Sequence, residues 1–156
     1  MISFSLSRLE KENIRLEGTE PPEFIVTTGG DVFTVASGVS YSLDVSKVSG
    51  GALVSGSAEV TVEGECGRCL AAVSRRVSTG DFRFFVETPP GMEICDISDD
   101  VRTEISLALP MNLLCRDDCR GLCPECGADL NKGKCSCKPK PSRGSGVWDA
   151  LDGLKL

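Results

Sequence analysis

Six of the nine cysteines of this chain fall within residues 115–137, which read CRDDCRGLCPECGADLNKGKCSC, and the sequence contains no histidine. The string Cys123-Pro124-Glu125-Cys126-Gly127 is typical of a metal-binding knuckle, a tight turn that projects two thiolates to one side. Two further cysteines follow after a loop rich in turn-forming residues. The sequence therefore predicts one tetrahedral Zn²⁺ site. Its expected ligands are Cys123, Cys126, Cys135 and Cys137.

A second CxxC motif lies far upstream, in Cys66-Gly67-Arg68-Cys69-Leu70. Two thiolates cannot complete a tetrahedral site, and two cysteines of the dense cluster remain once its last four are grouped. Counting therefore predicts a second zinc site, and its expected ligands are Cys66, Cys69, Cys115 and Cys119. The long loop between the two halves is no objection, because the entropic cost of closing a loop grows only logarithmically with its length.

Three alternatives to two zinc sites stay open at this point. The chain can hold one zinc ion together with several free thiols, it can form a disulfide framework, or its upstream CxxC can be redox-active. Cys95 is left over in every grouping, and we expect it to be a partly buried thiol without a role.

The whole chain has 156 residues, which is long enough for one domain with a hydrophobic core and a small appended module. Its 17 glycines favour short strands and tight turns over long helices. The first residues lack the basic and apolar segments of a secretory signal, and no apolar run is long enough to span a membrane. We therefore expect a cytoplasmic protein without a membrane partner, in which thiols stay reduced and available for metal.

Charge is distributed unevenly along the chain. Residues 1–129 carry 11 Lys or Arg against 21 Asp or Glu, whereas residues 130–146 carry five basic residues and no acid. The acidic body is a poor general binder of nucleic acid, because it repels phosphate. The candidate RNA contacts are therefore Lys132, Lys134, Lys138, Lys140 and Arg143. Arg116 and Arg120, which precede this segment, could add further contacts to phosphate. A solvated linker whose lysines serve solubility is the alternative.

The pattern of apolar residues predicts the body. Apolar side chains alternate with polar or small ones over residues 39–45, 54–62, 70–77 and 82–86, which predicts strands there. One amphipathic helix should follow, capped by Ser98 and ended by Pro110. Its expected apolar stripe is Val101, Ile105, Leu107 and Leu109. Without a βαβ pattern, these elements indicate an antiparallel sheet.

We therefore predict an α+β fold in three parts. Residues 1–110 should form a mainly antiparallel β body with one helix, residues 111–137 an all-cysteine, zinc-ribbon-like module, and residues 138–156 a basic linker with a short docking segment. In that last segment Trp148, Leu151 and Leu154 share the spacing of a helical turn and should dock on the body or on a partner.

These features together resemble the YceD-like family, the large ribosomal RNA subunit accumulation proteins. The resemblance rests on Cys66-Gly67-Arg68-Cys69-Leu70, on the helix ending Leu107-Ala108-Leu109-Pro110, on the string GLCPECGADLN at residues 121–131, and on the ending with Trp148. It implies a bacterial or plastid role in processing or accumulation of large-subunit (23S) rRNA and in ribosome assembly. The implied partner is that rRNA or a pre-ribosomal particle, reached directly or through a ribosomal protein. The ending departs from the family in lacking an Asp-Pro-Arg triplet.

The sequence argues against an enzyme. Without histidine there is no Ser-His or Cys-His pair and no catalytic zinc of the usual kind. No glycine loop of the phosphate-binding types occurs, and nothing indicates a small-molecule substrate. The remaining enzymatic alternative is thiol–disulfide exchange at Cys66 and Cys69, where Arg68 would lower the pKa of a thiol. The lack of a βαβ context around that motif weighs against this alternative.

Overall fold

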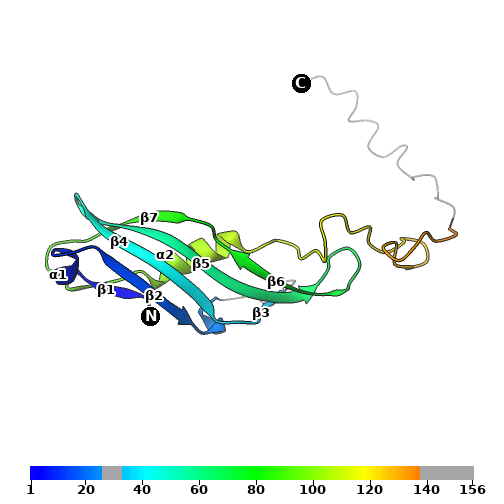
Figure 1. Ribbon diagram of the computed structural model, residues 1–156, viewed down its shortest axis with the longest axis horizontal. Helices are drawn as coiled ribbons and strands as arrows, with labels where there is room; N and C mark the ends of the chain where they lie inside the picture. Colours follow the sequence, from blue (N-terminus) through cyan, green and yellow to red (C-terminus); the bar gives the residue numbers. More distant parts are fainter. Residues whose placement is uncertain (26–32, 138–156) are drawn as a thin grey trace, which may run out of the picture. The chain divides into compact units, whose positions relative to one another are not determined.

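The structure, a computed structural model, describes residues 1–25 and 33–137 of the chain (Figure 1). The chain groups into two compact units, Met1–Cys119 and Arg120–Leu156. The upstream CxxC motif therefore shares the first unit with Cys115 and Cys119, while the last four cysteines lie in the second. The three-part division at residues 110 and 137 stays a prediction.

The first unit is mainly antiparallel β (Figure 1). Its strands are β1 (Ser3–Ser5), β2 (Ile14–Glu20), β3 (Phe33–Val35), β4 (Val39–Val48), β5 (Gly51–Glu65), β6 (Ala72–Ser78), β7 (Phe82–Glu87) and β8 (Ile94–Asp96). Its helices are α1 (Leu6–Leu9), the 3₁₀ helix η1 (Pro22–Phe24) and α2 (Ser98–Ala108). The prediction of a mainly antiparallel β fold with one main helix is confirmed.

Strand β5 organises the six-stranded sheet. One of its edges pairs with β4 over residues 51–59 and with β3 over residues 62–64, and the other edge pairs with β7 over residues 51–56 and with β6 over residues 59–65. Strand β2 continues the sheet beyond β4, whereas β1 and β8 pair separately as a two-stranded ribbon. Because β5 runs directly into Cys66, the longest strand of the body positions the first CxxC motif.

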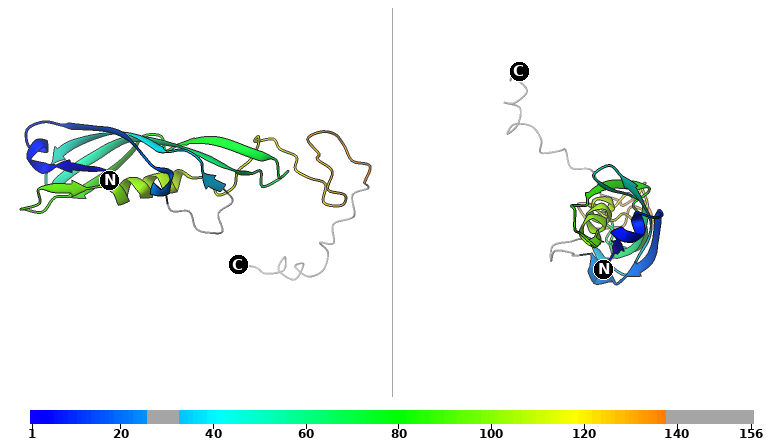
Figure 2. Two further views of the ribbon diagram at one scale, coloured as in Figure 1. Left: turned by 90° about the horizontal axis from the view of Figure 1, so that it is seen from below. Right: turned by 90° about the vertical axis from the view of Figure 1, so that its left-hand side faces the viewer.

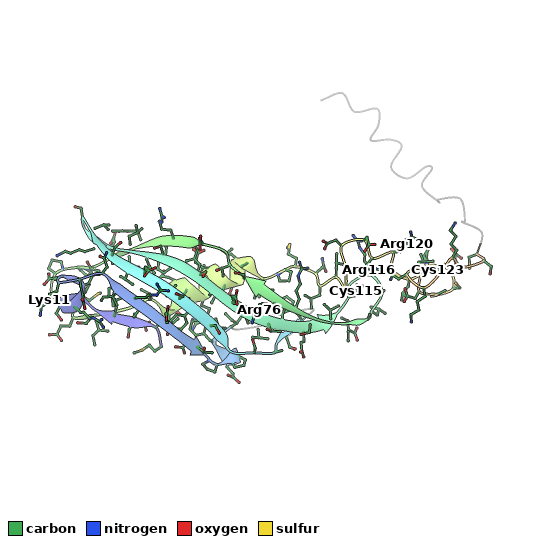
Figure 3. All side chains as sticks on the ribbon, viewed as in Figure 1. Lys11, Arg76, Cys115, Arg116, Arg120 and Cys123 are labelled. Atoms are coloured by element: carbon green, nitrogen blue, oxygen red, sulfur yellow. The ribbon has the colours of Figure 1, made fainter. Side chains whose placement is uncertain are left out.

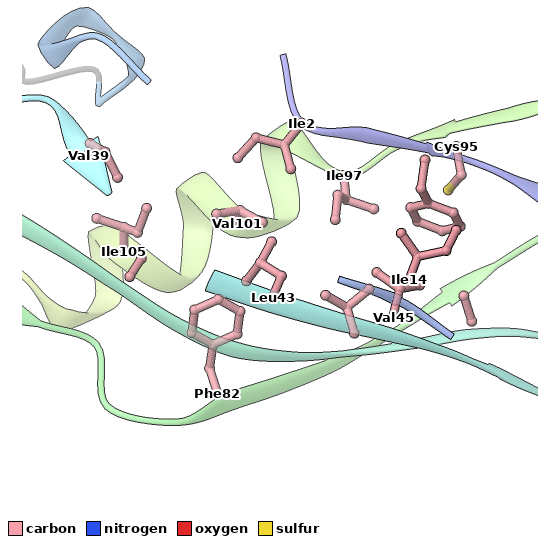
Figure 4. Close-up of a cluster of buried hydrophobic side chains, with 14 of the residues drawn as sticks. Ile2, Ile14, Val39, Leu43, Val45, Phe82, Cys95, Ile97, Val101 and Ile105 are labelled. Atoms are coloured by element: carbon pink, nitrogen blue, oxygen red, sulfur yellow. The ribbon is translucent and has the colours of Figure 1, made fainter. Parts of the chain in front are cut away.

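The hydrophobic core lies between the sheet and α2, around which the strands curve in the end-on view of Figure 2. Leu43 and Val45 of β4 share this core with Val101 and Ile105 of α2, and all four side chains are buried (Figure 4). Full burial of a side chain of this size contributes roughly 1.5–3 kcal/mol. The alternation in β4 and the apolar stripe of the helix therefore meet as predicted, with the exception of Leu107, which is 77% exposed.

Ser98 does not cap α2 in the predicted way. The N-cap position is Ile97, and no side chain caps the helix. Instead, the Ser98 hydroxyl accepts a hydrogen bond from the Ile2 N–H (2.8 Å) and donates one to Asp96 Oδ1 (2.6 Å). Asp96 Oδ1 also accepts the Ser98 N–H at 2.9 Å. This relay joins the N-terminal strand to the main helix and satisfies a buried hydroxyl.

Several boundaries differ from the sequence pattern. Strand β5 begins at Gly51, three residues before the predicted segment, because β4 and β7 both pair with its first residues. Strand β6 begins at Ala72, after the turn of the CxxC motif. The helix α2 ends at Ala108, before Pro110, as predicted. No helix in the described part of the chain is both long enough and apolar enough to cross a membrane.

Candidate metal centres

The first candidate centre, within unit Met1–Cys119, joins the turn between β5 and β6 to the segment that follows α2. Its four Sγ atoms, from Cys66, Cys69, Cys115 and Cys119, lie within 4.8 Å of one another. The Sγ atoms of Cys66 and Cys119 are 3.8 Å apart, and those of Cys69 and Cys115 are 3.6 Å apart. Four sulfurs that surround Zn²⁺ tetrahedrally at about 2.3 Å are separated by about 3.8 Å. The structure thus brings together the same four cysteines that the sequence analysis assigned to one site.

Backbone hydrogen bonds fix the first knuckle. The Leu70 N–H donates to the Cys66 carbonyl (2.9 Å), and the Cys66 N–H donates to the Ala71 carbonyl (2.8 Å). The Gly67 N–H donates to the carbonyl of Leu113 (2.8 Å), whose side chain is fully buried. Because Leu113 anchors the segment after α2, it delivers Cys115 beside the knuckle. Sequence reasoning missed this role of Leu113, for which no local pattern exists.

Arg68 links the two halves of the first centre. Its Nη1 donates to the carbonyls of Cys119 (2.9 Å) and Asp117 (3.3 Å). The guanidinium therefore holds the loop that carries Cys119 against the CxxC turn. Sequence reasoning considered only the effect of Arg68 on a thiol pKa.

The second candidate centre lies within unit Arg120–Leu156, and Figure 3 labels Cys123 there and Cys115 in the first centre. Its four Sγ atoms, from Cys123, Cys126, Cys135 and Cys137, lie within 4.8 Å of one another. The Sγ atoms of Cys123 and Cys135 are 3.4 Å apart. Both predicted sets of four thiols therefore have a geometry that can hold one metal ion each, with no oxygen or nitrogen ligand required.

The two knuckles share one backbone pattern. In the second, the Gly127 N–H donates to the Cys123 carbonyl (2.9 Å) and the Cys123 N–H donates to the Ala128 carbonyl (2.8 Å), as in the first. Gly127 has φ +73°, in the left-handed region that glycine favours. Leu70 takes the equivalent position of the first knuckle with φ +60°. A leucine there is under backbone strain that a glycine avoids.

The loop between the two cysteine pairs of the second centre is held by side chains. Asp129 Oδ1 accepts hydrogen bonds from the N–H and the amide of Asn131 (2.9 Å each), and Asn131 Oδ1 accepts the Arg120 N–H (2.8 Å). Residues 120–137 contain one isolated antiparallel bridge, between Leu122 and Asp129, and no longer strand. The centre therefore rests on a knuckle and a turn.

Two thiols of each set have pKa values shifted in opposite directions. Hydrogen bonds from the backbone of Cys115, Arg68 and Cys69 lower the pKa of Cys66 to about 6, while burial and the neighbouring thiols raise the pKa of Cys115 to about 12. In the second set, backbone hydrogen bonds lower the pKa of Cys123 to about 7, and hydrogen bonding to Cys126 and burial raise the pKa of Cys137 to about 12. Four thiolates at this spacing repel one another, so a divalent cation resolves the conflict.

All nine cysteines lie in the described part of the chain, and none forms a disulfide. The thiol of Cys95, on β8, is buried in the core of the first unit, where burial and then the nearby acidic side chains raise its pKa. It makes no part of either sulfur set.

Only some of the predicted RNA-contacting and docking residues lie in the part of the chain that the structure describes. Lys132 and Lys134 are exposed, and Lys132 Nζ lies 3.8 Å from Asp129 Oδ2. The Nε atom of the flanking Arg116, a residue labelled in Figure 3, lies 3.3 Å from Asp118 Oδ1. The remaining candidates lie outside the described residues: Lys138, Lys140, Arg143, Trp148, Leu151 and Leu154.

Residues 84–155 match the family model described as Large ribosomal RNA subunit accumulation protein YceD. An uncharacterized protein of Mycobacterium tuberculosis (strain ATCC 25618 / H37Rv) is 33% identical over 118 residues, which cover 65% of this chain and 57% of the relative. Two plant relatives carry the name Large ribosomal RNA subunit accumulation protein YCED homolog 1, chloroplastic. The one from Arabidopsis thaliana is 41% identical over 49 residues, and the one from Zea mays is 42% identical over 50 residues. These matches cover 31% of this chain and 15% and 17% of the two relatives.

The resemblance to the YceD-like family is therefore confirmed. The chain spans less than two thirds of the length of the first of these relatives. No solved structure matches the chain.

Proposed function

We propose that this YceD-like chain is a non-enzymatic, zinc-binding factor that assists the processing and accumulation of large-subunit (23S) rRNA during ribosome assembly in the cytoplasm. The single observation that carries the proposal is the match of residues 84–155 to the YceD family model. The matched region contains six of the eight clustered cysteines, so the metal centres and the family resemblance concern the same part of the chain.

Zinc fits both sulfur sets on chemical grounds. Each set offers four sulfur donors at tetrahedral spacing and leaves no position for water or substrate, which is the arrangement of structural zinc sites. Iron also accepts four thiolates, so a metal analysis must separate the two ions. The first centre would hold residues 66–69 against residues 115–119 inside the first unit, and the second would hold residues 123–137.

The second centre has the greater need for metal. Among residues 120–137 no large apolar side chain is buried, and Leu122 and Leu130 are only half-buried. A segment this short cannot bury enough apolar surface to fold by itself. We therefore propose that the metal-binding free energy is the folding free energy of this segment.

The rRNA is reached directly or through a protein of the pre-ribosomal particle. Residues 1–119 carry 10 Lys or Arg against 19 Asp or Glu, so the first unit repels phosphate. Direct contacts would thus concentrate on Lys132, Lys134 and the basic residues that follow. Such binding should be weak and should fall steeply with salt, because it depends on counterion release.

A thiol–disulfide enzyme is the second candidate, and the lowered pKa of Cys66 is the observation that favours it. The side chain of Cys66 is fully buried, however, so a disulfide substrate cannot approach its sulfur. We expect no multiple-turnover reduction of insulin disulfides by the metal-loaded protein. Catalysis by the wild type that Cys69→Ser abolishes would replace our proposal with the enzymatic one.

Deletion of the gene in its own organism tests the rRNA role. We expect large-subunit rRNA to fall relative to small-subunit rRNA, and its precursors to accumulate. Complementation with the wild type and with Cys95→Ser should restore the ratio, whereas Cys126→Ser should not, because Cys126 belongs to a sulfur set and Cys95 does not. An unchanged rRNA ratio in the deletion strain would contradict the proposal.

A further inference from the structure

Strand β7 has one edge without a partner strand in the described part of the chain. Its other edge pairs with β5, and no strand within residues 1–25 or 33–137 pairs with the open one (Figure 1). The six residues of β7 read FRFFVE and contain no proline or lysine, two residues by which edge strands avoid pairing. Aromatic and β-branched residues favour the strand conformation. The open edge of β7 is therefore one that a further strand can join.

The backbone groups of Arg83, Phe85 and Glu87 point to this open edge. The Thr88 N–H, just after β7, donates to the carbonyl of Gly50 (3.4 Å), just before β5. Successive residues of a strand turn their N–H and C=O groups to opposite edges. The even-numbered residues of β7 therefore turn theirs to β5, and the three odd-numbered residues turn theirs outward.

The order of side chains makes this edge complementary to itself. When two β7 strands pair antiparallel and use all three outward residues of each, Phe85 lies opposite Phe85 of the second copy. Arg83 then lies opposite Glu87 of the second copy, and symmetry repeats this opposite-charge pair. On the other face of the strands, Phe84 lies opposite Val86 of the second copy, an aromatic pair with a β-branched residue. Cross-strand pairs of both kinds stabilise a sheet.

The side chains at this edge are available to a second copy. Arg83 and Glu87 are exposed, and neither forms an ion pair with a residue in 1–25 or 33–137. The Phe85 side chain is 50% exposed, and Phe84 and Val86 are only half-buried against the core. Pairing of the two strands would remove part of this apolar surface from water.

The edge strands β2 and β6 are less suited to pair with themselves. On β2, Arg15 Nε already lies 2.7 Å from Glu17 Oε1 of the same strand. On β6, Arg75 and Arg76 are adjacent, so a symmetric pair of β6 strands would bring arginines of the two copies together.

We propose that the open edge of β7 joins a second copy of the chain, so that the two sheets continue as one across a two-fold axis at Phe85. Only one short strand of each copy pairs, so the interface is small and we expect a dissociation constant in the micromolar range. The inference goes beyond the proposed function and does not depend on it, because no cysteine of either sulfur set lies in β7.

Sedimentation equilibrium of the full-length, metal-loaded protein tests the proposal. The wild type should change from monomer to dimer between low micromolar and submillimolar concentration. Arg83→Glu or Glu87→Arg places like charges opposite each other in both pairs, and each should raise the dissociation constant about tenfold. The chain that carries both substitutions has opposite charges again and should regain the wild-type dissociation constant within about twofold. Glu63→Arg, at an exposed position of β5, should leave the dissociation constant unchanged.

Disulfide trapping tests the register. Residue 85 should lie opposite itself with the two Cα atoms about 5.5 Å apart, a separation that a disulfide can span. Phe85→Cys should therefore form a covalent dimer on mild oxidation. The wild type, with its nine native cysteines, gives the background, and Glu63→Cys should not exceed it.

Circular dichroism melting and metal content are measured for every variant, so that loss of folding is distinguished from loss of pairing. The proposal is overturned if the wild type stays a monomer at every concentration, which would leave the open edge of β7 to a strand of another protein. It is also overturned if the double substitution dimerises no better than the single ones, or if Glu63→Arg weakens the dimer as much as Glu87→Arg.

Discussion

A single hydroxyl group, that of Ser98, connects the first strand of the protein to its main helix. It accepts the Ile2 N–H and donates to Asp96, and it is the one polar side chain buried in the described part of the chain. The sequence singled out Ser98 as a helix cap, because serine before an apolar stripe is the usual cap signal. The partner of its oxygen could not be predicted, since Ile2 lies 96 residues away.

Replacing Ser98 by alanine should destabilise the first unit by about 1–3 kcal/mol, because the buried Ile2 N–H then has no acceptor. Urea unfolding followed by tyrosine fluorescence or circular dichroism measures this loss. Ser106→Ala, at an exposed position of the same helix, should change stability by less than about 0.5 kcal/mol. Equal effects of the two substitutions would show that the relay contributes nothing.

Asp96 should make stability depend on pH. Hydrogen bonds from Ser98 hold the pKa of this carboxyl below its ordinary value of 3.8. A lowered folded-state pKa gives stability that is fully present above pH 3.8 and is lost as the pH falls through the folded pKa. The difference in unfolding free energy between the wild type and Asp96→Asn should therefore be constant near neutral pH and shrink in acid. A difference that stays the same from neutral pH to acid would contradict this assignment.

At the scale of elements, the local sequence pattern predicted the elements that bury one face in the core. The alternation in β4 and the apolar stripe of α2 each identify one buried face, so both elements were found with their faces. The three-residue strand β8 carries no such signal, because it is stabilised by pairing with β1 across some ninety residues of sequence. The length of β5 likewise follows from its four partners and not from its own composition.

Gly56 is a position in β5 that leaves no room for a larger side chain. A Cβ atom added there would lie 2.1 Å from the Ser42 carbonyl oxygen and 2.8 Å from the Leu43 Cα. Gly56→Ala must therefore push β4 and β5 apart, and we expect a loss of about 1–3 kcal/mol in unfolding free energy. Gly133→Ala, where an added Cβ meets nothing within 4 Å, should leave the unfolding of the first unit unchanged. Wild-type stability of Gly56→Ala would contradict the strand register.

At the scale of the whole molecule, the grouping of cysteines was predictable because tetrahedral stoichiometry is a strong constraint. Eight thiols in four closely spaced pairs divide into two sets of four, and the structure brings together the same sets. The contacts that position them were not predictable. Arg68 reaches the carbonyl of Cys119, 51 residues away, and the N–H of Gly67 donates to the carbonyl of Leu113 in the segment after α2. Residues 138–156, including the predicted docking side chains, lie outside the described part of the chain.

The two centres should respond separately to substitution. Cys126→Ser should release one metal ion and unfold residues 120–137 while the first unit keeps its amide protection, because no buried apolar core holds that segment. Cys66→Ser should instead disturb the first unit, where Cys66 is fully buried at the end of β5. Hydrogen exchange on both variants checks this. Full protection of residues 120–137 in Cys126→Ser would contradict the metal-dependent fold.

The central claim is that two structural zinc ions hold this protein together, and metal analysis of the chain purified without chelator tests it most directly. Elemental analysis against protein concentration should give two zinc ions per chain for the wild type and one each for Cys66→Ser and Cys126→Ser, with iron absent. A wild-type protein that contains no zinc, or that contains one ion and loses it entirely in Cys126→Ser, would contradict the account.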